Sequence, residues 1–183
     1  MTIFQCGYQT VFGINSGILV SEYWQFNSLE KITLAGTLET ELELKSPADK
    51  YFKRISSELH HAPNASSDKV HTIEVHEGDW ETPGSVKLWT YTINGKEEVF
   101  KEKIEVDEAK KSATFVAVGG HLLEKYKSYK VTLHIVLKGE AVVAKITLDF
   151  EKHHQSHDDL KDYMEFVISL AKDIDEHLAG QAD

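Results

Sequence analysis

Cysteine and basic residues are scarce in this 183-residue sequence, and each scarcity excludes a class of protein. The one cysteine, Cys6, has no partner for an internal disulfide or for a zinc site built on paired cysteines, which favours a cytoplasmic protein. Lys and Arg number 20 against 30 Asp and Glu, which gives a formal net charge of -10. Such a surface repels a phosphate backbone, so we expect no nucleic-acid partner.

Long apolar runs are also missing. No stretch approaches the ~20 apolar residues of a membrane-spanning helix, so we expect no membrane insertion. Residues 4–20 are moderately apolar, but they lack the basic start and the dense apolar run of a secretory signal. Apolar residues make up 41% and charged residues 27% of the chain, as in globular proteins, and the length fits one domain.

Alternating apolar and polar residues predict an antiparallel β-sheet. Residues 38–44 place leucine or threonine on one side and glutamate on the other, the pattern of a half-buried strand. After residue 70, short strand-like segments are separated by turn signals, of which Asn94-Gly95 is the strongest for a hairpin. The segments 129–135 and 142–150 alternate most cleanly. We therefore expect about six antiparallel strands after the first, with one apolar and one polar face.

Helical patterns stand on both sides of these strands. Ser46, Pro47 and Asp49 have the spacing of a helix start with Ser46 as the N-cap, and they predict a short helix up to about Glu58. From residue 160 to residue 180, apolar residues recur at the spacing of a long amphipathic helix. The sheet and this helix must cover each other's apolar faces, so the fold class is α+β. Residues 34–183 form the predicted domain, and residues 1–33 are expected to be a poorly ordered extension.

Two motifs resemble a phosphate-binding loop and a metal site, but neither has the pattern that such a site requires. The loop 77–85 contains glycines, but it carries acids and leads into a strand, whereas a phosphate loop ends in Gly-Lys-Ser/Thr and opens a helix. His153, His154 and His157 lie close to two aspartates, yet their spacing matches no standard metal site. We expect no metal and no cofactor.

Catalytic groups form no complete set in the sequence, so we expect no catalytic residues. Lys87, Trp89 and Tyr91 alternate along one strand, and if the aromatic side faces inward, Lys87 lies near the rim of the same face. A lysine beside a tyrosine leaves acid–base chemistry open as an alternative. Inward aromatic residues fit a filled core as well as a hollow one, because periodicity shows which residues face inward and not how much space they leave.

Six short stretches, taken together with their order and spacing, are specific enough to indicate a protein family. They are Gly36–Ser46, His60-His61 with Asn64-Ala65-Ser66, His76–Trp80, Asn94-Gly95-Lys96, Leu123–Lys130 and Lys172–Leu178. In this order the chain resembles the major latex proteins, a branch of the Bet v 1 and pathogenesis-related class 10 superfamily of plants. The sequence departs from the family pattern at Gly119-Gly120-His121, where Glu-Gly-Asp is common, and at Leu59, where proline usually precedes the histidine pair.

The resemblance implies a seven-stranded antiparallel sheet that grips a long C-terminal helix, with two short helices and a large internal cavity for apolar compounds. Lys87 and Lys103 are the polar anchors that it implies near the openings of the cavity. The glycine-rich loop of the family corresponds to Gly78–Gly84. Carried over by position, the ligand-binding residues are Lys87, Trp89, Tyr91, Lys103, Phe115, Val131, Leu133, Tyr163, Met164, Val167 and Ala171, and the loop residues are Gly78, Asp79, Trp80 and Gly84.

The resemblance therefore implies a non-catalytic binder or carrier of hydrophobic small molecules, such as fatty acids, sterols and flavonoid- or hormone-like compounds. Its implied setting is plant stress or defence, and its implied state is a monomer or a weak dimer. Two alternatives stay open. One is a cavity enzyme of the same fold that uses an inward Lys, Tyr or Glu as acid and base, and the other is a filled-core protein that binds protein partners.

Overall fold

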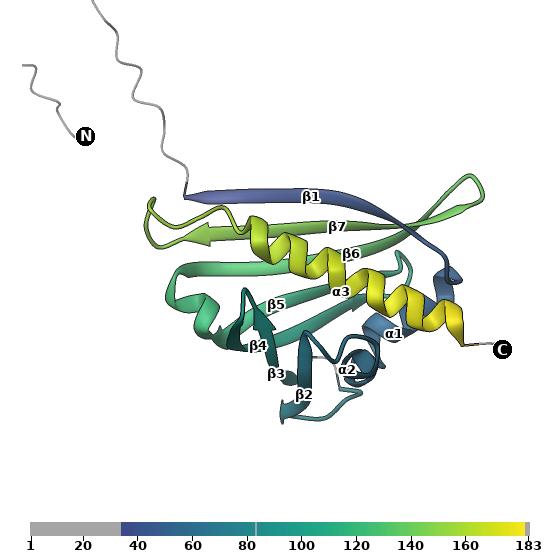
Figure 1. Ribbon diagram of the computed structural model, residues 1–183, viewed down its shortest axis with the longest axis horizontal. Helices are drawn as coiled ribbons and strands as arrows, with labels where there is room; N and C mark the ends of the chain where they lie inside the picture. Colours follow the sequence, from purple (N-terminus) through teal and green to yellow (C-terminus); the bar gives the residue numbers. More distant parts are fainter. Residues whose placement is uncertain (1–33, 83, 182–183) are drawn as a thin grey trace, which may run out of the picture. The chain divides into compact units, whose positions relative to one another are not determined.

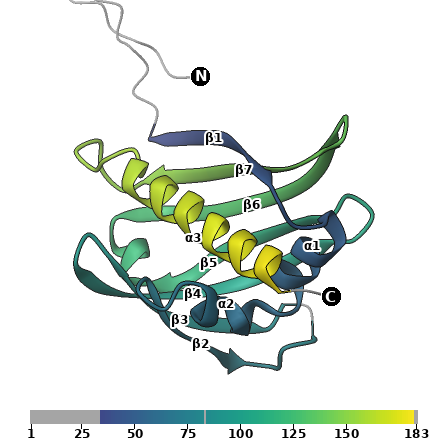
Figure 2. The same cartoon turned by 45° about the vertical axis from the view of Figure 1, so that its right-hand side comes forward.

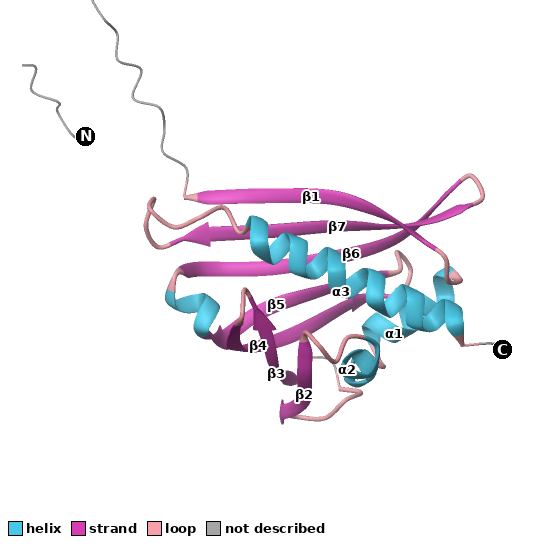
Figure 3. Cartoon of the chain, in the orientation of Figure 1, coloured by secondary structure: helices cyan, strands magenta, loops and turns pink. Residues whose placement is uncertain are grey.

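A single antiparallel sheet and three α-helices make up the structure (Figures 1 and 3), a computed structural model that describes residues 34–82 and 84–181. The expected extension, residues 1–33, lies outside the described residues. The helices are α1 (Ala48–Ser56), α2 (Ala62–Ala65) and α3 (Lys161–Gly180), with the 3₁₀ turns η1 (Leu59–His61) and η2 (His121–Glu124). The strands are β1 (Ala35–Leu44), β2 (Val70–Glu77), β3 (Val86–Ile93), β4 (Lys96–Asp107), β5 (Ser112–Gly120), β6 (Tyr126–Lys138) and β7 (Ala141–Lys152).

The strand order in the sheet is β1-β7-β6-β5-β4-β3-β2. Strands β2 to β7 follow one another as a meander, whereas β1 pairs with β7, with Ala35 opposite Glu151. Helix α3 lies across one face of this curved sheet, and α1 lies beside the C-terminal end of α3 (Figures 1 and 2). The predicted seven-stranded α+β fold with a long C-terminal helix is confirmed.

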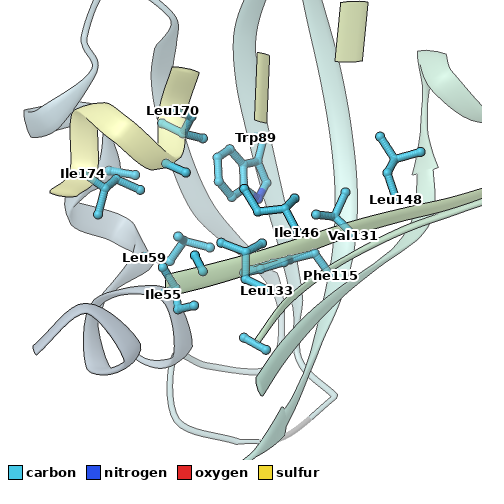
Figure 4. Packing of buried hydrophobic residues seen from close by; sticks show 14 of the residues in the cluster. Ile55, Leu59, Trp89, Phe115, Val131, Leu133, Ile146, Leu148, Leu170 and Ile174 are labelled. Atoms are coloured by element: carbon cyan, nitrogen blue, oxygen red, sulfur yellow. The ribbon is translucent and has the colours of Figure 1, made fainter. Parts of the chain in front are cut away.

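The predicted alternation in the strands is also confirmed. In β6, Tyr129, Val131 and Leu133 are buried while Lys130 is exposed, and β7 repeats the pattern with Ile146 and Leu148 buried. In β1, Glu39, Glu41 and Glu43 are exposed on the outer face. The buried residues of the strands and of α3 pack on each other in one hydrophobic core, part of which is shown in Figure 4.

Two tight backbone conformations fix the middle of the sheet. The β3–β4 hairpin turns at Asn94 and Gly95, with φ angles of 52° and 72°, as the Asn-Gly signal predicts for a two-residue turn. At the end of β5, Gly120 has φ 102°, and a Cβ there would lie 2.1 Å from the carbonyl oxygen of Val99. A larger residue at Gly120 would push β4 and β5 apart.

The predicted start of α1 is wrong by one residue. Pro47 occupies the N-cap position, and no side chain caps the helix. Ser46 instead donates its hydroxyl to Asp175 Oδ1 of α3 at 2.6 Å, and the backbone N–H groups of Lys45 and Ser46 also donate to Asp175 at 2.9 Å. The residue chosen as a local cap therefore joins the end of β1 to α3.

Candidate functional site

A cavity of about 90 Å³ lies between the concave face of the sheet and α3. Figure 4 shows part of its wall, where Trp89, Phe115, Val131 and Leu133 of the sheet face Leu170 and Ile174 of α3. The lining is almost entirely apolar or aromatic. It consists of Tyr51, Ile55, Leu59, Trp89, Tyr91, Phe100, Glu102, Phe115, Leu122, Tyr129, Val131, Leu133, Tyr163, Phe166, Val167, Leu170, Ala171 and Ile174.

The cavity is smaller than the large one that the resemblance implies. Aromatic rings take up much of the space: the Tyr91 and Phe166 centroids lie 5.1 Å apart, and Tyr129 makes edge contacts with Phe100 and Tyr163 at 5.7 and 6.2 Å. An apolar cavity of ~150 Å³ takes up benzene. A ligand larger than that enters this site only if wall side chains move.

Most of the residues carried over from the resemblance line this cavity. They are Trp89, Tyr91, Phe115, Val131, Leu133, Tyr163, Val167 and Ala171. Met164 is buried but lies outside the lining, and Lys103 is exposed on the opposite face of β4. The neighbour of Lys103, Glu102, is the β4 residue that faces inward, because side chains of a strand alternate between its two faces.

Glu102 is the one ionisable carboxyl group in the cavity wall that the structure describes. Glu102 is 1% exposed, and its Oε1 accepts a hydrogen bond of 2.7 Å from Trp89 Nε1. Burial raises the pKa of Glu102 to about 8, although the indole N–H and the charge of Lys87 act in the opposite direction. The group is therefore largely protonated at neutral pH.

Lys87 is directly opposite Glu102 in the β3–β4 pairing, but its ammonium group contacts the loop 78–85. Lys87 Nζ donates to the carbonyl oxygen of Asp79, and it lies 4.7 Å from the ring centroid of Trp80. Trp80 in turn contacts the ring of His60 in η1 at 4.8 Å. Burial lowers the pKa of Lys87. This lysine holds the loop against β3 and does not line the cavity.

The loop 78–85 is closed by its own hydrogen bonds. Asp79 Oδ1 accepts from the backbone N–H groups of Glu81 and Thr82 at 2.8 and 2.6 Å, and these bonds lower the pKa of Asp79. Gly78 has φ 81°, and a Cβ there would lie 2.2 Å from Ser85 Oγ. Gly84 also has a positive φ, 84°. The described residues of the loop are thus held together by hydrogen bonds within the loop.

Three tyrosines supply hydroxyl groups to the cavity wall. Burial raises the pKa of Tyr91, Tyr129 and Tyr163, and the Tyr91 and Tyr163 hydroxyls interact with each other. They stay neutral at physiological pH and serve as hydrogen-bond donors and acceptors. Tyr51 is different, because its hydroxyl donates to the Ala171 carbonyl of α3 at 3.2 Å.

A second, polar groove of about 830 Å³ borders the cavity. It is formed by the β3–β4 turn, η2 and the segment between β7 and α3, and it shares Leu122 and Tyr163 with the cavity lining. His157 lies in this groove. Within residues 34–82 and 84–181, no three His, Cys, Asp or Glu side chains are placed to hold a metal ion.

The family model for the pathogenesis-related protein Bet v 1 family matches residues 33–181. The chain belongs to the Bet v 1 family. Its relatives include the Arabidopsis thaliana proteins MLP-like protein 328, 39% identical over 145 residues, and MLP-like protein 43, 39% identical over 155 residues. These matches cover 79% and 83% of this chain and 96% and 98% of the relatives. The predicted resemblance to the major latex branch of the family is confirmed.

Solved structures of Bet v 1 relatives have the same fold. Ginseng major latex-like protein 151 from Panax ginseng is 35% identical, with a TM-score of 0.76 over 79% of this chain and 97% of that one. Norcoclaurine synthase from Thalictrum flavum has a TM-score of 0.69 over 92% of this chain and all of that one, but its 18% identity supports likeness of fold alone. Members of the Bet v 1 family are generally ligand-binding proteins. None of the described helices is long and apolar enough to cross a membrane.

Proposed function

We propose that this protein binds and carries small hydrophobic molecules in the cavity beneath α3, without changing them chemically. The single observation that carries the proposal is the cavity wall itself, which presents aromatic and aliphatic side chains from β3–β6, α1 and α3 around one carboxyl group and a few tyrosine hydroxyls. Concave, mostly apolar sites with a few polar groups are typical of small-molecule binding. Sterols, flavonoid- or hormone-like compounds and fatty acids are the candidate classes, in a cytoplasmic stress or defence setting and in a monomer or weak dimer.

Entry from the polar groove fits this proposal. Tyr163, at the start of α3, lies in the wall of both the groove and the cavity, as does Leu122 of η2. A displacement of these two side chains would join the 830 Å³ groove to the 90 Å³ cavity. The larger ligands then gain the space that the cavity alone does not offer.

The expected affinity is modest. An apolar ligand that loses about 400 Å² of surface to the cavity gains roughly 10 kcal/mol at ~25 cal/mol per Å². Association costs of at least ~4 kcal/mol leave about 6 kcal/mol, a dissociation constant in the tens of micromolar. Any cost of moving wall side chains weakens binding further.

Titration with Nile red, a neutral dye whose fluorescence depends on its surroundings, tests the proposal. We expect saturable binding at one site, with displacement by at least one of a sterol, a flavonoid and a fatty acid. A well-folded sample that binds neither the dye nor the three compounds would contradict the proposal and favour the filled-core alternative.

An enzyme of the same fold is the second candidate, and Glu102 is the observation that favours it. A buried inward carboxyl group with a raised pKa is what acid–base catalysis in this cavity requires. Lys87 offers no help as a partner base, because its ammonium group is bound to the Asp79 carbonyl. Mass spectrometry of bound ligands after incubation separates the candidates, since a carrier returns its ligand unchanged and an enzyme does not.

A further inference from the structure

The polar part of the cavity wall indicates the chemical class of ligand more specifically than the apolar part does. Glu102 accepts one hydrogen bond, from Trp89 to Oε1, and no other partner of its side chain lies within the described residues. Its second oxygen, Oε2, has no partner in this part of the chain but is not fully enclosed. Among the described residues, Arg54 Nε is the one side-chain polar atom that is both fully enclosed and without a hydrogen-bond partner. Since Glu102 lines the cavity and is 1% exposed, Oε2 is the atom that the cavity leaves accessible.

Glu102 forms no ion pair with any residue that the structure describes. The cavity lining has no Lys, Arg or His among the residues that the structure describes. The cross-strand neighbour Lys87 acts on Glu102 through its charge alone, because its Nζ is bound to the Asp79 carbonyl and lies over Trp80. A buried carboxyl group without an ionic partner is costly when charged and is stabilised by any partner that balances the charge.

We propose that Glu102 selects ligands that carry a basic nitrogen on an apolar body, and that it disfavours ligands with an ionised carboxylate. The proposal rests on the proposed function of the cavity and names the chemical class of ligand for it. A basic nitrogen suits both forms of Glu102: it accepts the proton from Oε2–H, or its own N–H donates to an ionised Oε2. In either form the pair has no net charge.

A carboxylate ligand has the opposite effect. With either form of Glu102, at least one negative charge would be enclosed by a wall whose described residues include no cation. The cost of enclosing such a charge is the same kind of cost that keeps Glu102 protonated. Fatty acids in their ionised form are therefore expected to bind more weakly than amines of the same size.

The experiment compares three probes of nearly equal size: 2-naphthylmethylamine, 2-naphthalenemethanol and 2-naphthoate. Each is titrated at pH 7.5 against the full chain with Nile red bound, and its dissociation constant is taken from the displacement of the dye. The variants are Glu102→Gln, which can still accept from Trp89 but cannot ionise, and Glu105→Gln on the exposed face of the same strand as the matched control.

We expect the wild type to bind the amine at least about tenfold more tightly than the carboxylate, the effect of a hydrogen bond to a charged group. Glu102→Gln should reduce this ratio by about tenfold and change the affinity of the alcohol less, whereas Glu105→Gln should leave the ratio unchanged. Two results would overturn the inference while leaving the carrier function intact: Nile red is displaced without discrimination between amine and carboxylate, or the preference for the amine survives in Glu102→Gln. A well-folded sample that binds neither Nile red nor any of the three naphthalene probes would refute both.

Discussion

A carboxyl group enclosed by aromatic side chains lowers the stability of a folded protein when it must ionise, and Glu102 is such a group. The pKa of Glu102 is raised from 4.5 to about 8, chiefly by burial. Between these two values the folded state holds a proton that the unfolded state releases. The free energy of unfolding therefore falls as the pH rises through this window, by about 1.4 kcal/mol per pH unit, and is unaffected by this group below it.

Glu102→Gln should remove the part of the pH-dependent fall in the free energy of unfolding that this carboxyl group causes. We expect the free energy of unfolding of the variant, relative to the wild type, to rise steadily between pH 5 and pH 8 and to level off above pH 8. Urea denaturation at pH 5, 6.5, 8 and 9 measures the difference. Glu105→Gln, on the exposed face, should follow the wild type, and a constant offset at all four pH values for Glu102→Gln would show that the carboxyl group is ionised throughout.

The indole N–H of Trp89 supports the same carboxyl group. Trp89→Phe keeps an aromatic ring in the wall but removes the donor to Glu102 Oε1. We expect a loss of ~1–3 kcal/mol in the free energy of unfolding, because a buried acceptor is left without its partner. Urea denaturation of the wild type, Trp89→Phe, Glu102→Leu and the double variant forms a double-mutant cycle that isolates the interaction between the two side chains. If the losses in the free energy of unfolding of the two single variants add up to that of the double variant, the hydrogen bond contributes nothing.

The position of Glu102 could have been predicted from the sequence, although Lys103 was the residue expected there. A two-residue turn at Asn94-Gly95 places Trp89 opposite Phe100 and Lys87 opposite Glu102, which is the register observed. Cross-strand partners lie on the same face of a sheet, so the inward Trp89 fixes Phe100 and Glu102 as inward. The attachment of Lys87 to the Asp79 carbonyl depends on the path of a loop, and no spacing in the sequence specifies it.

At the scale of the elements, α3 is joined to the end of β1 through one buried carboxylate. Asp175 accepts from the backbone N–H groups of Lys45 and Ser46 and from the Ser46 hydroxyl. Asp175→Ala should lower the free energy of unfolding by about 3 kcal/mol or more, since it leaves several buried donors unpaired. The measurement is urea denaturation monitored by circular dichroism.

The adjacent residue Glu176 provides the control for this variant. Glu176 is exposed, and its carboxylate lies 3.4 Å from Lys45 Nζ at the surface. Glu176→Ala should cost less than about 1 kcal/mol, as exposed ion pairs generally do. Equal losses in the two variants would show that Asp175 is no more important than a surface charge.

The elements themselves were largely predictable, because period-two and helical patterns reflect burial directly. Strands β1, β6 and β7 and helix α3 appear where the alternation and the apolar stripe predict them. The N-cap at Ser46 failed for a physical reason. An N-cap serine accepts a hydrogen bond from a backbone N–H of the helix through its Oγ. The Ser46 hydroxyl instead donates to Asp175, 129 positions along the chain, and Pro47 occupies the N-cap position.

At the scale of the whole molecule, the volume of the cavity decides what the protein can hold, and this volume could not be predicted from periodicity. Ala171 of α3 lines the cavity, and its replacement by leucine adds three carbon atoms to a space of about 90 Å³. Ala171→Leu should weaken Nile red binding at least about tenfold without lowering the free energy of unfolding, as cavity-filling substitutions do. The dye titration and urea denaturation together measure this outcome.

Ala179→Leu places the same change on the exposed face of α3 and should leave dye binding unaltered. If Ala171→Leu also leaves it unaltered, the dye binds outside the cavity. If Ala171→Leu lowers stability as well as binding, the wall is too rigid to accept even this small addition, and the movement required for larger ligands becomes untenable.

The pairing of β1 with β7 also determines when the protein can fold. Ala35 is paired with Glu151, so the first strand has no neighbour in the sheet until the last one has been synthesised. Contacts between residues this distant in the chain close slowly, because the entropy of a long loop is lost before the strands gain their hydrogen bonds. A chain emerging from the ribosome therefore carries an unpaired β1 until β7 has emerged as well, and the sheet is completed only then.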